Sequence, residues 1–148
     1  MRGNPVRKLL SIIVVLGLGY YAFDESGVAS RFGRDVGAPD SAIVSAFQRR
    51  RSGVQVEGSG IVVRILADDL DGDRHQRFIL RLDSDLTVLV AHNIDLAPRV
   101  PRLNEGDLVR FFGEYEWNDQ GGVVHWTHRD PRGRHVAGWL KHEGGTYQ

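Results

Sequence analysis

The sequence predicts a mainly β protein: a small five-stranded barrel preceded by one short helix and an N-terminal hydrophobic helix. An apolar run at residues 9–23, a helix-like stretch at 39–53 and five short β-rich runs within 61–127 support this prediction. With 148 residues, the chain can bury one small core. We therefore expect a signal peptide or signal anchor at 1–23, a linker at 24–39 and an exported domain at 40–148.

The N-terminal segment is typical of an export signal, because Arg2, Arg7 and Lys8 precede its apolar run. Fifteen residues span roughly 22 Å as a helix, less than the ~30 Å hydrocarbon core, so a cleaved signal peptide and a short anchor are both open. Aromatic residues at the exit, followed directly by Asp24 and Glu25, favour an uncleaved anchor. The positive-inside rule then predicts a single-pass inner-membrane protein with its domain in the periplasm, or an exported protein if the signal is cleaved.

The composition excludes some chemistry and some partners. The chain has no cysteine, so it offers neither disulfides nor thiolate ligands. Beyond residue 30 it carries 16 Lys+Arg against 17 Asp+Glu, and nucleic acid is therefore an unfavoured partner. The expected partners are the membrane, through the N-terminal helix, and an envelope polymer or a protein. The oligomeric state is left open.

One short helix is expected at the start of the exported domain. Residues 39–41, Pro-Asp-Ser, offer a helix start, and Ile43, Val44 and Phe47 form one apolar face. The arginines at 49–51 are expected in the last turn, where cations complement the helix dipole.

The β-rich runs predict a barrel. They are separated by turn residues and occupy 61–67, 75–82, 87–93, 108–117 and 122–127. Five short strands with a longer excursion before the fourth are similar to the OB architecture. In that architecture a helix commonly follows the third strand, but Pro98 and Pro101 leave room here for at most one helical turn. The expected fold is therefore an OB-like barrel.

The run GGVVHWTHRDPRGRH, residues 121–135, is the densest group of chemistry-bearing side chains. Imidazoles and carboxylates bind metals and move protons near neutral pH. Here they are His125, His128, Asp130 and His135, around Trp126. Alternation along a strand places His125 and His128 on opposite faces, so they converge only if the strand ends or bulges at Thr127.

A turn beyond Thr127 would let His128, Asp130 and His135 share one pocket, with ligands that zinc or manganese accepts. A divalent metal, zinc or manganese, is the cofactor this pattern suggests. Two alternatives stay open. The same residues can form a structural network, in which His125 bonds across the sheet and Trp126 packs in the core, or they can contact a ligand directly.

A second group of polar residues follows the third strand. His92 ends that strand, and Asp95 and Arg99 follow in the loop. An imidazole near a carboxylate can act as an oriented base, and Arg99 can bind an oxyanion. The alternative is an Asp95–Arg99 ion pair that fixes the loop.

Two other strands add polar faces. His75, Arg77 and Arg81 share one face of the second strand. If it borders His125, the resulting groove would suit an anionic polymer or a phosphoryl group, whereas a solvated outer face is the alternative. On the fourth strand Glu114 and Glu116 share a face and are capable of acid and base work, at distances from other groups that the sequence does not fix.

Four blocks, RHQRFIL, AHNIDLAPR, GEYEWN and GGVVHWTHRDP, resemble the recurrent blocks of a small bacterial family of exported proteins known only as a domain of unknown function. The resemblance covers residues 60–147. It implies an exported domain and brings no activity. A looser similarity to small periplasmic OB-fold proteins rests on the strand count and the GD-x-V-x-F-x-G turn, and it transfers no functional residues.

These patterns favour a membrane-anchored periplasmic binding module. Its expected binding residues are Arg77, His92, Arg99, His125 and Trp126, beside the candidate metal ligands His128, Asp130 and His135. The alternative is a metal- or histidine-dependent hydrolase, resembling a phosphodiesterase or nuclease, with His92 or His125 as base and Arg99 or Arg77 stabilising the anion. A structural partner of an envelope complex is the second alternative.

Overall fold

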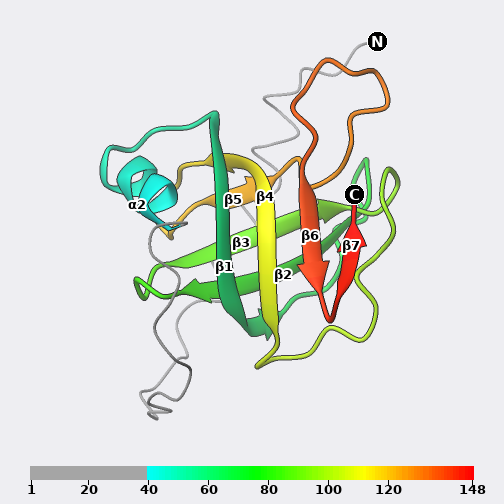
Figure 1. Ribbon diagram of the computed structural model, residues 1–148, viewed down its shortest axis with the longest axis horizontal. Helices are drawn as coiled ribbons and strands as arrows, with labels where there is room; N and C mark the ends of the chain where they lie inside the picture. The colour runs from blue at the N-terminus through cyan, green and yellow to red at the C-terminus, as the bar shows by residue number, and fades with distance from the viewer. Residues whose placement is uncertain (1–39) are drawn as a thin grey trace. The chain divides into compact units, whose positions relative to one another are not determined.

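The computed structural model describes residues 40–148 (Figure 1). The expected anchor at 1–23 and linker at 24–39 lie outside the described residues. Among residues 40–148, no helix has the length and apolar character that a membrane crossing requires.

The predicted short helix is α2 (Ser41–Gln48), which packs on β1 (Val54–Ile65). Its face toward the barrel carries Ile43 and Ala46, which are both buried. The arginines at 49–51 do not stand in its last turn, as the sequence predicted, but follow the helix. The helix stops there because Arg50 adopts a left-handed conformation, with φ of 52°.

Five strands close into the predicted barrel. With β1 they are β2 (His75–Leu82), β3 (Thr87–Asn93), β4 (Leu108–Glu116) and β5 (Val123–His125). Their order is β1-β2-β3-β5-β4, and pairing of β4 with β1 closes the ring. The β3–β5 pair is parallel, and the other neighbours in the ring are antiparallel.

The structure differs from the expected strands in three places. The first strand begins at Val54, seven residues before the predicted start. The fifth ends at His125, because Trp126 has a φ of 51° and leaves the extended conformation. The tail forms a hairpin of β6 (Trp139–His142) and β7 (Gly145–Tyr147), in which β6 pairs with β4. Trp139 therefore extends the sheet alongside β4.

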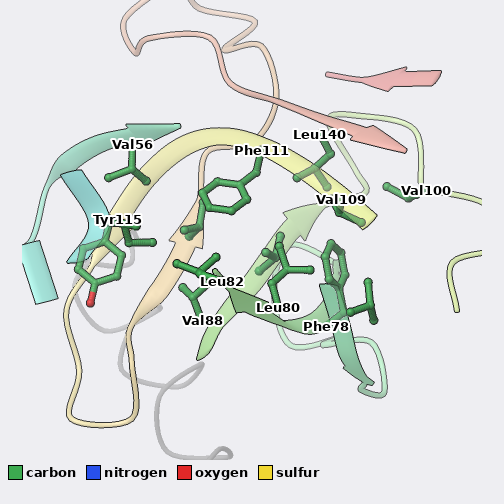
Figure 2. Close-up of a cluster of buried hydrophobic side chains, with 14 of the residues drawn as sticks. Val56, Phe78, Leu80, Leu82, Val88, Val100, Val109, Phe111, Tyr115 and Leu140 are labelled. Carbon is green, nitrogen blue, oxygen red and sulfur yellow. The ribbon is translucent and has the colours of Figure 1, made fainter. Parts of the chain in front are cut away.

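The core fills the barrel with the inward side chains of alternating strand positions (Figure 2). Phe78, Leu80 and Leu82 line the inner face of β2. Near the end of β4 the inward residue is Tyr115, whose hydroxyl donates to the carbonyl of Gly121 at 3.0 Å. Burial raises the pKa of Tyr115 to about 12. The residues on either side of Tyr115 consequently point out of the barrel.

Candidate functional site

The outer face of the barrel brings together polar residues from three strands. Because Tyr115 points inward, Glu114 and Glu116 both point outward from β4. The register places Glu114 opposite Gln55 on β1 and opposite His125 on β5. Cross-strand partners on one face have Cβ atoms about 4.5–5.5 Å apart, so these three side chains meet.

The His125 imidazole lies between the two carboxylates. Its Nε2 is 3.6 Å from an oxygen of Glu114 and 3.7 Å from an oxygen of Glu116. Both distances exceed the ~3.2 Å limit of an ordinary N–H···O hydrogen bond. Within the described residues this buried nitrogen therefore has no hydrogen-bond partner. The adjacent imidazole lowers the pKa of Glu116.

A second imidazole reaches the same carboxylates from the loop after β5. The Nε2 of His135 donates to Glu114 at 2.7 Å, and its Nδ1 lies 2.8 Å from the carbonyl oxygen of Val136. The Trp126 ring stacks on the His135 ring, with centroids 4.0 Å apart and planes at 9°. We call Gln55, Glu114, Glu116, His125 and His135 the outer-face cluster.

Two glycines let the loop return to the end of β5. A Cβ on Gly138 would lie 1.9 Å from the carbonyl oxygen of Trp126, and a Cβ on Gly113 would lie 2.4 Å from that of His125. The amide of Gly138 also donates to the carbonyl of His128 at 2.9 Å. Close backbone contact of this kind requires glycine, and it holds Trp126 and His135 over the site.

The other two residues of the expected metal pocket shape the loop. The Asp130 carboxylate accepts the amides of Arg132, Arg134 and His135 at 2.8–3.0 Å, and these bonds lower its pKa. The buried His128 donates from Nδ1 to the carbonyl of Arg129 at 2.7 Å, and burial lowers its pKa. The side chain of His135 bonds to Glu114 instead of these two residues.

His92 points into the barrel, where it is completely buried. Its Nε2 lies 3.0 Å from the carbonyl of Pro98 and its Nδ1 lies 2.8 Å from the hydroxyl of Thr127. The carbonyl only accepts, so Nε2 carries the hydrogen and Nδ1 accepts from Thr127. Burial lowers the pKa of His92 to about 4. The ring is therefore neutral and separated from the outer-face cluster.

The expected arginines are also engaged. Arg99 forms an ion pair with Asp68, whereas Asp95 pairs with Arg74 at 2.7 Å. The expected Asp95–Arg99 pair is therefore wrong, because Arg74, the residue before β2, binds the Asp95 carboxylate. The Arg77 guanidinium donates to the carbonyl of Ala67 at 2.8 and 3.0 Å and is nearly buried.

The chain matches the family described as protein of unknown function (DUF3465) over residues 27–148. The chain belongs to the DUF3465 family. The expected membership of a family of unknown function is thereby confirmed, and no curated protein matches the chain.

For this DUF3465 protein, the sequence predicted several residues of the outer-face cluster, but not that they lie close together. The outward pair of Glu114 and Glu116 and the outward His125 followed from strand alternation. Gln55 was missed, although the Val-Gln-Val-Glu alternation of β1 was a signal for an outward polar side chain. His75 lies near His125, and burial, with a smaller effect from His125, lowers its pKa.

Proposed function

We propose that this DUF3465 protein is a membrane-anchored binding module of the periplasm, an OB-like barrel that holds a small ligand at the outer-face cluster. The basic residues and apolar run at its N-terminus support export and anchoring. The family match supplies no activity, so the binding role is argued from the site.

One observation carries this proposal. Within residues 40–148, four buried side-chain polar atoms lack a hydrogen-bond partner, and one of them belongs to Asp40. The other three are Gln55 Nε2, His75 Nδ1 and His125 Nε2. Gln55 and His125 flank Glu114 on the two neighbouring strands, and His75 begins β2. Each unsatisfied buried group costs about 1–3 kcal/mol, and one bound ligand at this face would offset that cost for several groups together.

The binding role is preferred to hydrolysis because two of the three expected catalytic residues are engaged. His92 is buried with both nitrogens bonded, and Arg99 is paired with Asp68. A purely structural partner would have no use for two unsatisfied polar side chains that flank one carboxylate.

Native mass spectrometry of the full chain, released from detergent, tests the binding role. We expect a non-covalent mass above that of the polypeptide. His125→Ala and the isosteric Glu116→Gln should lose it, whereas the exposed control Arg81→Ala should keep it. Wild-type protein at the bare polypeptide mass would contradict the proposal. The same spectrum shows whether the N-terminal segment is retained.

Protease treatment of spheroplasts tests the location. We expect digestion of the barrel from outside the inner membrane, with the protein recovered in the membrane fraction. Protection of the barrel in intact spheroplasts, followed by digestion after lysis, would place the domain on the cytoplasmic side and refute the periplasmic role.

A further inference from the structure

We propose that the ligand of the outer-face cluster is a divalent transition-metal ion, zinc or manganese, bound by Glu114, Glu116 and His125. This inference rests on the proposed binding function and names the ligand of that site. It assigns the ion to β4 and β5 instead of to His128, Asp130 and His135.

The distances fit a metal ion better than a hydrogen-bonded network. The two carboxylates and the imidazole each offer one ligand atom, and these atoms lie within 4.8 Å of one another. Bonds of about 2.0–2.2 Å in tetrahedral geometry separate two ligand atoms by roughly 3.3–3.6 Å. The 3.6 and 3.7 Å separations from His125 Nε2 are close to that spacing and too long for hydrogen bonds.

The chemistry of the donors selects the class of ion. Two carboxylates and one neutral imidazole carry two negative charges, which a divalent cation neutralises. Mixed nitrogen and oxygen donors suit zinc and manganese, whereas calcium and magnesium prefer sites made of oxygen alone. The chain has no cysteine, so its sites lack the thiolates that copper(I) favours.

The surroundings of Glu114 match those of a ligating carboxylate. His135 donates to the second oxygen of this carboxylate at 2.7 Å, and its ring is stacked on Trp126. Outer hydrogen bonds of this kind orient metal ligands and raise affinity. Three protein ligands also leave a coordination position for water, and the unpartnered amide of Gln55 is a suitable donor to such a water.

The loop residues are less suited to the ion. The Asp130 carboxylate already accepts three backbone amides, which would lose their partners if the carboxylate turned to a metal. Both ring nitrogens of His135 already have partners, Nε2 at Glu114 and Nδ1 at the carbonyl of Val136. These contacts make the loop a support for the site.

Metal titration of the full chain tests the assignment. The purified protein is stripped with a chelator and titrated calorimetrically with ZnCl₂ and MnCl₂, with elemental analysis of the dialysed product. We expect one equivalent of zinc or manganese per chain. Affinity should fall at least tenfold in Glu116→Gln and His125→Ala. In His135→Ala it should fall about 10–100-fold, as expected when an outer hydrogen bond to a ligand is lost.

Arg81→Ala, which changes an exposed side chain on β2, is the matched control and should keep near-wild-type affinity. Circular dichroism of each variant establishes that it is folded, and the isosteric Glu116→Gln provides a readout if His125→Ala does not fold. Wild-type protein that binds neither ion, or variants of Glu116 and His125 that bind as well as wild type, would overturn the inference. If His128→Ala lost metal binding and Glu116→Gln kept it, the metal ligands would lie in the loop after β5 instead. An organic adduct in native mass spectrometry that His125→Ala loses would support the binding module and refute the metal.

Discussion

The buried imidazole of His92 predicts a specific loss of stability in acid. In the folded protein its pKa is lowered from 6.5 to about 4, because burial disfavours the charged ring. The unfolded chain takes up this proton as the pH falls through 6.5, whereas the folded protein resists until about 4. Protonation therefore favours the unfolded state, and the contribution of His92 is complete above pH 6.5 and lost between pH 6.5 and 4.

The magnitude follows from the two pKa values. They differ by about 2.5 pKa units, and each unit corresponds to about 1.36 kcal/mol, so the complete effect is about 3 kcal/mol. Between pH 7 and pH 5, the free energy of unfolding should fall by roughly 2 kcal/mol from this residue alone.

Urea unfolding of wild type and His92→Gln at pH 7 and pH 5 measures the effect. The variant is expected to be less stable at pH 7, because it loses packing and the hydrogen bond with Thr127. Its stability should depend less on pH, by about 2 kcal/mol over this interval. His75 and His128, whose pKa values are also lowered by burial, remain in both proteins and cancel in the comparison. Equal pH dependence in the two proteins would refute the neutral, buried state of His92.

Three further substitutions test contacts of β5 and the loop that follows it. Thr127→Val removes the hydroxyl that donates to His92, and it should cost about 1–3 kcal/mol in urea unfolding; an unchanged midpoint would contradict the hydrogen bond. Gly138→Ala places a Cβ 1.9 Å from the carbonyl oxygen of Trp126, so it should cost about 1–3 kcal/mol and alter the near-ultraviolet circular dichroism of the stacked ring, while a neutral effect on both would disprove the close contact. Asp130→Ala frees three loop amides and should speed tryptic cleavage of that loop, whereas an unchanged cleavage rate would show that the carboxylate does not order it.

The barrel was predictable because the alternation of apolar residues in its strands is local information. The beginning of β1 was missed because glycines interrupt it, and glycine has a low strand propensity. The structure gives the reason for one of them: a Cβ on Gly60 would lie 2.8 Å from the carbonyl oxygen of Arg81 on β2. Tertiary contact thus overrides the local preference at that position.

Only the outward direction of its side chains could be predicted for the outer-face cluster, for a different physical reason. Alternation indicates that Glu114 and His125 face outward, but their meeting depends on the register between β4 and β5. That register is set by closure of the barrel, including the parallel pairing of β3 with β5, which no local pattern records. The ion-pair partner of Asp95 likewise depends on the tertiary structure, because it is Arg74, 21 positions earlier in the chain.

Anomalous X-ray scattering from crystals of the full chain grown with zinc tests the central claim most directly. The account predicts a zinc peak on the outer face of β4 and β5. The ion should lie about 2.0–2.2 Å from Nε2 of His125 and from one oxygen each of Glu114 and Glu116. A zinc peak at His128 and Asp130, or the absence of any peak at the outer-face cluster, would contradict it.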